Sequence, residues 1–271
     1  MNVSREAIRT FAELTGDDAP IHSDPAFAKR SGFAAPIAQG LLVAAFAEAS
    51  LSRRGDDAAT RPFEIRFQRP VLTDDRLECR AAAAGDGQTS FEVVNQRDEI
   101  VARGGTGNAL AWSSSAPSDA ASQGSSTPAD VWYAEDVMEH FEFGEAEIAW
   151  GDDAAVDRFG ALFRGGDDTT VSPFPAALLF ARGFACFLGA LLDCPLPEAG
   201  SAGHIGDHWR LYRIPGADET VRVRYRAASL NGSRSRPGMA IVGFAIDLCV
   251  DAERVLEGEA VIMIPTRPVA G

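Results

Sequence analysis

Asp17 and His22 are the two residues of this chain whose types and spacing most directly suggest catalysis. An aspartate and a histidine held close together can share one water molecule, so that one takes a proton and the other delivers one. Histidine suits this exchange because its ordinary pKa, about 6.5, lies near neutrality. Gly16 permits a sharp turn before the aspartate, and Pro20 stiffens the loop that carries His22. Taken alone, an Asp-x-x-x-x-His pair more often braces or caps a loop, so the surrounding residues decide the interpretation.

Those surrounding residues form a longer pattern, and segment 11–42 reads FAELTGDDAPIHSDPAFAKRSGFAAPIAQGLL. It resembles the motif of MaoC-like hydratases and dehydratases, whose core runs Gly-Asp-x-Asn-Pro-(Ile/Leu)-His and corresponds here to residues 16–22. The resemblance extends more loosely over residues 1–111. It implies a hotdog fold in which Asp17 and His22 act on a water molecule and a 2-enoyl thioester. Further matches at fixed spacing are Asp24, Ala28, Gly32, Phe33, Pro36, Ile37 and Gly40.

Gly40 is the third candidate catalytic position. The resemblance puts an oxyanion-type backbone donor at this glycine, where a side chain would hinder the approach of a thioester carbonyl. Gly40 also falls near the start of a predicted buried helix, where free N–H groups and the helix dipole favour negative charge. A glycine that only permits close helix packing is the alternative interpretation.

Two positions depart from the family pattern. Ala19 stands where the motif has asparagine, and Gln39 stands where a histidine often precedes the helix glycine. The side chain of Ala19 can neither brace the loop nor orient a water molecule. Neither change removes the proposed acid–base pair, but both leave room for a changed substrate or reaction.

The resemblance predicts a hydro-lyase that reversibly hydrates 2-enoyl thioesters or dehydrates (R)-3-hydroxyacyl thioesters, carried on coenzyme A or on an acyl carrier protein. The direction and the stereochemistry come from the resemblance alone. Two alternatives stay open: a thioesterase on the same fold, in which water attacks the carbonyl carbon, and a non-catalytic protein that binds acyl thioesters. Incubation with a saturated acyl-CoA separates the first alternative, because only hydrolysis releases a free thiol.

The chain of 271 residues is long enough for two domains. Segment 113–128, SSSAPSDAASQGSSTP, has no large apolar residue and is predicted to be a flexible linker. It separates an N-terminal domain at 1–112 from a C-terminal domain at 129–271. Both halves run through helix, loop, long apolar helix and strands, which indicates duplication of a whole domain.

Period-two alternation of apolar residues predicts four strands in each half. Helices at 36–51 and 175–192 are apolar or small on nearly every side, so each should be wrapped by a sheet. We therefore predict an α+β protein of two tandem hotdog domains, each an antiparallel sheet around a long central helix, that together form a pseudo-dimer. The predicted strands are 63–70, 73–80, 90–95, 100–109, 208–215, 217–224, 239–250 and 255–264, with hairpin turns at Asp98-Glu99 and Asp251-Ala252.

The second half is predicted to lack the catalytic pair. Its counterpart of residues 16–18 is Gly166-Asp167-Asp168, but Ser172 falls at the position of His22. Leu178 and Leu179 replace Gln39 and Gly40. We expect a degenerate partner that shapes an acyl pocket. His204 and His208 are interpreted as surface or structural residues that precede a strand. Aromatic residues that either line this pocket or simply pack the core are Phe159, Phe163, Phe174, Phe180, Phe184 and Phe187.

The bulk composition limits the partners and the compartment. A formal net charge of −14 argues against nucleic acid as a partner. The four cysteines fit neither a zinc site nor a disulfide framework, which favours a reducing, cytoplasmic location. The first ten residues have no signal-peptide core, and the most apolar stretch, 174–192, is too interrupted for a membrane span.

No metal or redox cofactor is expected, because the sequence has no phosphate-binding glycine loop and no His/Cys cluster. The expected partner is the thioester substrate, and association into a homodimer is left open. Candidates for contacting the phosphate of a phosphopantetheine arm are Arg30, Arg53, Arg54, Arg61 and Arg69.

Overall fold

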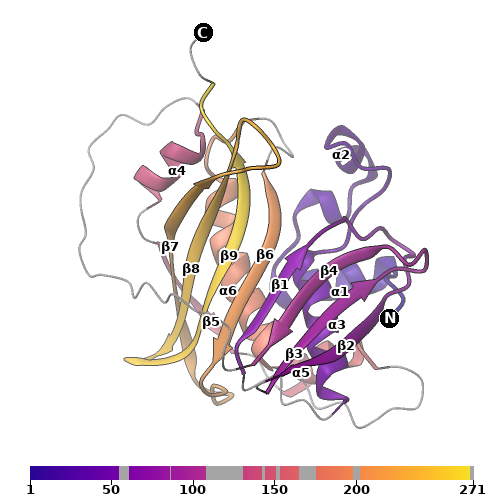
Figure 1. The fold of residues 1–271 in the computed structure, drawn as a ribbon. Helices are drawn as coiled ribbons and strands as arrows, with labels where there is room; N and C mark the ends of the chain where they lie inside the picture. The colour runs from indigo at the N-terminus through magenta and orange to yellow at the C-terminus, as the bar shows by residue number, and fades with distance from the viewer. Residues whose placement is uncertain are drawn as a thin grey trace.

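The computed structural model describes residues 1–54, 61–85, 87–107, 131–141, 144–150, 153–164, 175–197 and 202–268. Its strands form one antiparallel sheet in the order β2-β3-β4-β1-β6-β9-β8-β7-β5 (Figure 1). The predicted linker at 113–128 and the boundaries beside it lie outside the described residues.

The N-terminal half contributes four strands and the central helix α3. Its elements are α1 (Arg5–Thr15), the short 3₁₀ helix η1 (Pro20–His22), α2 (Pro25–Arg30), α3 (Gly40–Ser52), β1 (Phe63–Phe67), β2 (Glu78–Gly85), β3 (Gln88–Val94) and β4 (Ile100–Thr106).

The C-terminal half contributes five strands and the central helix α6. Its elements are α4 (Ala134–His140), β5 (Gly144–Ala149), α5 (Asp153–Ala161), α6 (Pro175–Leu192), β6 (Gly203–Leu211), β7 (Thr220–Gly232), β8 (Met239–Val250) and β9 (Glu253–Pro265).

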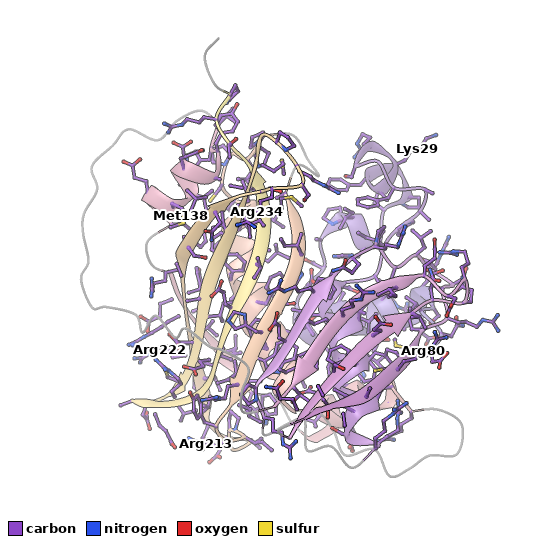
Figure 2. The ribbon with its side chains drawn as sticks, viewed as in Figure 1. Lys29, Arg80, Met138, Arg213, Arg222 and Arg234 are labelled. Atoms are coloured by element: carbon purple, nitrogen blue, oxygen red, sulfur yellow. The ribbon has the colours of Figure 1, made fainter. Side chains whose placement is uncertain are left out.

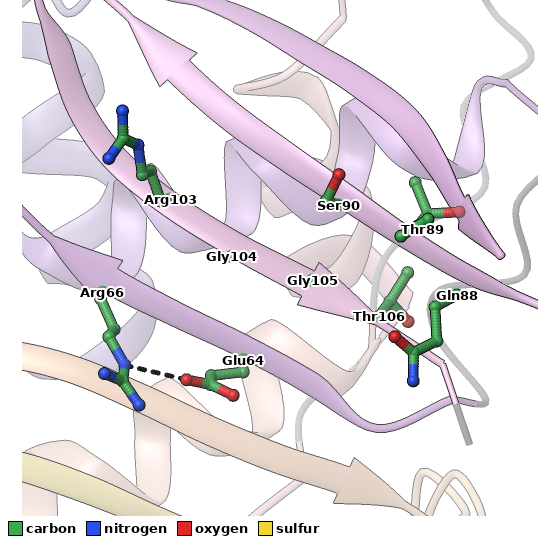
Figure 3. A pocket seen from close by; sticks show the side chains of 10 residues that line it. Glu64, Arg66, Gln88, Thr89, Ser90, Arg103, Gly104, Gly105 and Thr106 are labelled. Carbon is green, nitrogen blue, oxygen red and sulfur yellow. Dashed lines mark hydrogen bonds and ion pairs between the residues drawn. The ribbon is translucent and has the colours of Figure 1, made fainter. Parts of the chain in front are cut away.

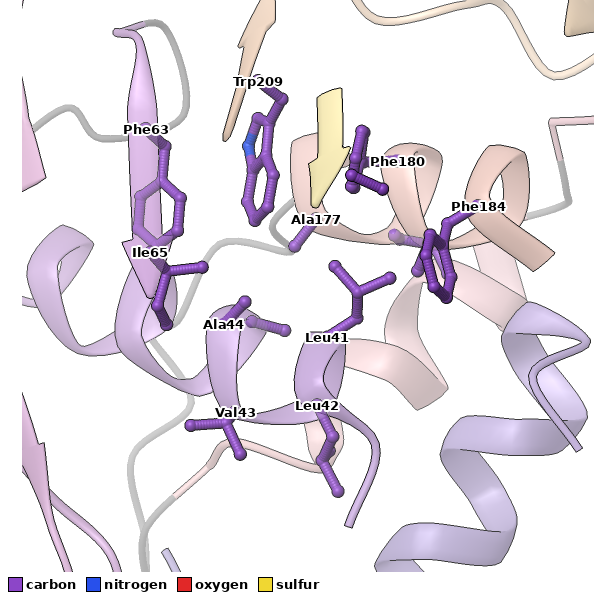
Figure 4. Close-up of a cluster of buried hydrophobic side chains, with 14 of the residues drawn as sticks. Leu41, Leu42, Val43, Ala44, Phe63, Ile65, Ala177, Phe180, Phe184 and Trp209 are labelled. Carbon is purple, nitrogen blue, oxygen red and sulfur yellow. The ribbon is translucent and has the colours of Figure 1, made fainter. Parts of the chain in front are cut away.

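The halves join where β1 pairs with β6, with Phe63 opposite Trp209. The Trp209 ring stacks on Phe63 at 4.6 Å and on Phe180 of α6 at 4.9 Å between centroids. Leu41 and Ala44 of α3 lie in the same buried cluster, beneath the sheet (Figure 4). One sheet with two buried helices on one face is the predicted α+β double hotdog architecture.

Helix α6 has the predicted bounds, but α3 begins at Gly40 rather than at residue 36. The residues before it are held in extended form, because Ile37 bridges Leu72 and the Ala38 N–H donates to the Val71 carbonyl. Because of these contacts, the helix begins four residues later than its apolar composition predicts.

The sequence predicted which strands exist more accurately than it predicted where they begin and end. β2 begins at Glu78, five residues after its predicted start, because Asp74 adopts a φ of 72° and the Asp75 carboxylate accepts from the Leu72 N–H. β6 begins five residues earlier than predicted, and β7 begins later and runs further. β5 at the sheet edge was not predicted. Both hairpin turns are confirmed, with positive φ at Asp98 and Asp251.

Charged side chains cover the outer strands of both halves (Figure 2). Arg80 on β2 pairs with Asp98 at 2.6 Å, and Arg222 on β7 pairs with Glu145 at 2.8 Å. Exposed pairs of this kind contribute little to stability. All four cysteines are free thiols. No helix within the described ranges combines the length and hydropathy of a membrane span.

Candidate active site

Asp17 lies in a sharp turn immediately after α1. Gly16 caps that helix in the left-handed conformation, with a φ of 87°, as the glycine at this position predicts. The turn carries the Asp17 side chain into the protein, where it is only 4% exposed. A carboxylate at this depth needs a chemical or structural reason, because burial of an unpaired charge is costly.

His22 is held by η1, which begins at Pro20. Its Nδ1 lies 2.8 Å from the Ile37 carbonyl oxygen. A carbonyl can only accept, so Nδ1 carries a hydrogen and donates it to Ile37. The other ring nitrogen, Nε2, lies 3.7 Å from Asp17 Oδ1. The structure thus brings together the two residues that the sequence selected.

The space between Asp17 and His22 is polar and lacks a direct hydrogen bond. Burial raises the pKa of Asp17, while His22, His204 and the Ala19 N–H oppose this rise. Asp17 Oδ1 has no hydrogen-bond partner within the described part of the chain. A water molecule beside the pair could contact both the free oxygen and the free nitrogen.

Gln39, one of the two departures from the family pattern, braces the Asp17 loop. Its side chain is fully buried, and Nε2 donates to the carbonyl oxygens of Ile8 and Asp17, each at 3.2 Å. At the other departure, the backbone N–H of Ala19 donates to the Asp17 carboxylate. Sequence reasoning missed the Gln39 contacts because they depend on how α1 packs against the segment that begins α3.

Gly40 is the first residue of α3. Among the described residues, the N–H groups of Gly40 and Leu41 have no acceptor. A Cβ at position 40 would lie 2.7 Å from the Phe67 ring and 3.0 Å from His204 Nδ1. Close packing therefore requires glycine at this position.

His204 is the residue at this site that sequence reasoning did not select. Both His204 and His208 lie inside β6, so the expectation that they precede a strand is wrong. His204 stacks on Phe184 at 4.7 Å, and its Nε2 lies 2.7 Å from Asp207 Oδ1. His208 faces Glu259, and burial lowers its pKa to about 4. The sequence contains no signal for this pairing, because residues three apart on a regular strand point to opposite faces.

The expected counterparts in the second half are only partly described. Residues 166–168, Ser172 and Phe174 lie outside the described ranges, whereas Leu178 and Leu179 are buried in α6. The other five phenylalanines are buried in the core, and Phe184 also contacts His204.

Four of the five arginines proposed for phosphate binding make contacts within the protein. Arg53 donates to the Phe163 carbonyl at 2.6 Å, and Arg54 donates to the Ala81 carbonyl at 3.2 Å. Arg30 lies over the Phe27 ring, and Arg61 donates to the Gly87 carbonyl. None of these contacts tests phosphate binding.

A separate depression of about 330 Å³ lies on β1, β3 and β4 (Figure 3). Glu64 and Arg66 line it, and they flank Ile65, whose side chain is buried beneath the sheet. Side chains alternate along a strand, so this depression is on the outer face, away from the helices. Within the described ranges, no group of three or more His, Cys, Asp or Glu residues is arranged to hold a metal ion.

Comparison with known proteins supports the motif in the N-terminal half. Residues 1–103 match the model of the MaoC-like domain family. Over 98 residues the chain is 38% identical to 3-hydroxyacyl-thioester dehydratase X of Mycobacterium tuberculosis, covering 35% of this chain and 33% of that protein. Over 94 residues it is 39% identical to the peroxisomal enoyl-CoA hydratase 2 of Arabidopsis thaliana, covering 34% and 30%. The matches thus span about a third of these relatives.

Solved structures resemble the whole chain. A MaoC domain dehydratase structure from Chloroflexus aurantiacus matches with a TM-score of 0.68 at 12% identity, covering 99% of this chain and 93% of that one. A Mycobacterium tuberculosis protein described as a double hotdog fold matches with a TM-score of 0.60 at 13% identity, covering 97% and 93%. At these identities the likeness shows the fold alone.

Proposed function

We propose that this chain hydrates 2-enoyl thioesters, or in reverse dehydrates (R)-3-hydroxyacyl thioesters, a proposal supported by the match of residues 1–103 to the MaoC-like domain family and by the hydratase and dehydratase relatives of that segment. The carrier is coenzyme A or an acyl carrier protein. One observation carries the proposal: Asp17 Oδ1, which has no hydrogen-bond partner among the described residues, lies 3.7 Å from His22 Nε2.

In the hydration direction, a water molecule held by Asp17 and His22 attacks the β carbon of the enoyl group. One member of the pair takes the proton from this water, and a proton from the pair passes to the α carbon. The pair therefore ends with as many protons as it began with. Burial suits Asp17 to this exchange because its raised pKa makes the carboxyl easier to protonate.

Attack on the β carbon moves the electrons of the enoyl double bond toward the thioester carbonyl and gives an enolate. The negatively charged oxygen of this enolate needs hydrogen-bond donors. We assign the Gly40 N–H to this role, because it is free at the start of α3 and the helix dipole favours negative charge there. No metal ion or redox cofactor is required by this sequence of proton transfers.

The test is the loss of the conjugated enoyl-thioester absorbance with crotonyl-CoA and longer 2-enoyl-CoAs. Wild type should turn over at least one of these substrates. Asp17→Asn and His22→Ala should each lower kcat by about 10²–10⁴-fold, the usual contribution of an acid–base group. Asp18→Asn is the matched control, because Asp18 is exposed in the same loop.

The outcomes separate the proposed roles. Activity that survives in both Asp17→Asn and His22→Ala would show that the site is elsewhere. Release of free thiol from a saturated acyl-CoA, without hydration of enoyl-CoAs, would replace the hydratase by a thioesterase. Binding without any turnover would indicate an acyl-thioester-binding protein.

A further inference from the structure

A second histidine–aspartate pair, His204 and Asp207, comes from the C-terminal half and is not used in the mechanism above. The register of β6 against β9 shifts between His204 and Gly206, which marks a bulge. Residues three apart on a regular strand point to opposite faces, but a bulge can re-aim one of them. His204 Nε2 and Asp207 Oδ1 are consequently only 2.7 Å apart.

The His204 ring is fixed beside the first turn of α3. Phe184 stacks on it at 4.7 Å, and the Phe67 ring meets it edge-on at 5.1 Å. Its Nδ1 lies 3.0 Å from the point where a side chain on Gly40 would begin. In the described part of the chain, this Nδ1 has no hydrogen-bond partner.

The surroundings of Asp207 decide where the protons of the pair reside. The Asp207 side chain is completely buried, and its Oδ2 has no partner among the described residues. A net negative pair would leave a buried charge uncompensated, which is costly. The direction of the Asp207 pKa, raised by burial, agrees with this.

Two forms of the pair are electrically neutral: a protonated carboxyl beside a neutral imidazole, and a carboxylate beside an imidazolium. In either form one proton lies between Asp207 Oδ1 and His204 Nε2. In either form Nδ1 also carries a hydrogen, which makes it a donor. The charged groups that face the ring are Asp207 on its own strand and Asp17 after α1, while α3 and α6 present Gly40 and Phe184.

We propose that His204 Nδ1–H donates a second hydrogen bond to the thioester carbonyl oxygen, beside the Gly40 N–H. Asp207 is then a positioning residue that keeps the hydrogen on Nδ1. The inference deepens the proposed function and rests on it for the position of the substrate. The enolate oxygen receives one donor from α3 of the first half and one from β6 of the second. The C-terminal half thus contributes chemistry as well as shape.

The test needs a readout that does not depend on turnover, and cinnamoyl-CoA provides one. A hydrogen bond to its carbonyl oxygen polarises the conjugated system and moves the absorbance band to longer wavelength. His204→Phe keeps the aromatic stack and removes the donor. It should abolish most of the shift and lower kcat for crotonyl-CoA by about 10²–10³-fold, with KM nearly unchanged. His204→Asn, whose side-chain N–H falls near Nδ1, should keep part of both.

Variants of the partner and of a neighbouring histidine complete the experiment. Asp207→Asn can donate to Nε2 and leave Nδ1–H in place, so it should keep the shift, whereas Asp207→Leu should lose it. His208→Gln lies on the same strand but faces Glu259, and should match wild type. Thermal melting shows which variants are folded. If His204→Phe does not fold, His204→Asn is used in its place to test the donor.

Each outcome bears on one claim. A full band shift in folded His204→Phe would overturn the donor role, even if kcat falls. No shift in wild type would overturn it as well. A shift that wild type shows and His204→Phe loses, without hydration of any enoyl-CoA by wild type, would retain the donor and reject the proposed function.

Discussion

At the scale of single residues, the sequence predicted the pair that the structure brings together but not the residues that hold it. Asp17, His22 and Gly40 lie in one continuous motif, so their spacing alone suggested a site. Gln39 and His204 act across the fold: one reaches back to α1, and the other arrives from a strand more than 150 residues away in the chain. The local sequence pattern around a residue contains no signal for contacts with residues that are distant in the chain.

The Gln39 contacts support a prediction about the loop of Asp17. Gln39→Met keeps about the same volume but removes the donor to the Ile8 and Asp17 carbonyls. The free energy of unfolding should fall by about 1–3 kcal/mol, the cost of leaving buried acceptors unpaired. If the bracing also sets the position of Asp17, kcat should fall while KM changes less. Chemical denaturation and enoyl-CoA kinetics measure the two effects, and unchanged values for both would contradict the bracing role.

At the scale of elements, the long apolar helices were predicted best, because a helix with no polar face has to be buried. Edge strand β5 was missed because its residues alternate only between exposed and half-buried positions, so it has no strong apolar period. The starts of α3 and β2 differ from the predicted ones because the segments that precede these two elements contact each other. Ile37 bridges Leu72, and the Ala38 N–H donates to the Val71 carbonyl. The apolar periodicity, the repeated order of elements and the family resemblance thus predicted the architecture, whereas tertiary contacts determine where each element starts.

The two central helices meet through a buried acid that should make stability depend on pH. Glu48 of α3 is completely buried, and its carboxylate accepts from the Ala177 N–H at the start of α6 at 3.2 Å. Burial raises the Glu48 pKa to about 8, and the Ala177 N–H opposes this. Between its ordinary value and pH 8, the folded protein therefore holds a proton that the unfolded chain has lost. Stability from this group is complete at low pH and falls as pH rises toward 8.

Glu48→Gln should remove this dependence. The free energy of unfolding of wild type should decrease between pH 5 and 8 more steeply than that of the variant, by about 1.4 kcal/mol per pH unit. Asp17 and Asp207 contribute to the slope in the same direction in both proteins, because burial also raises their pKa values. Denaturation at several pH values measures the slopes, with exposed Glu13→Gln as the control. Parallel slopes for wild type and Glu48→Gln would refute the assignment.

At the scale of the whole molecule, one sheet runs through both halves, and the β1–β6 pair is its only strand pairing between them among the described residues. The candidate site lies beside this junction, since Asp17 and Gly40 come from one half and His204 from the other. Catalysis and folding of the halves should consequently be coupled. In this proposal the second half completes the sheet through β6 and supplies His204 to the candidate site.

Trp209 is the residue through which this coupling can be tested. Its ring lies between Phe63 of β1 and Phe180 of α6, and Phe63 in turn stacks on Phe91, so the aromatic column crosses the junction. Trp209→Ala should lower the free energy of unfolding by about 3–5 kcal/mol, as large-to-small changes of buried aromatics do. Trp209→Phe should cost less, and Ile214→Ala, at an exposed position, should cost little. Because the column belongs to both halves, Trp209→Ala should unfold them together in a single transition at lower denaturant. Two separate transitions, with only the C-terminal one displaced, would show that the halves are independent units.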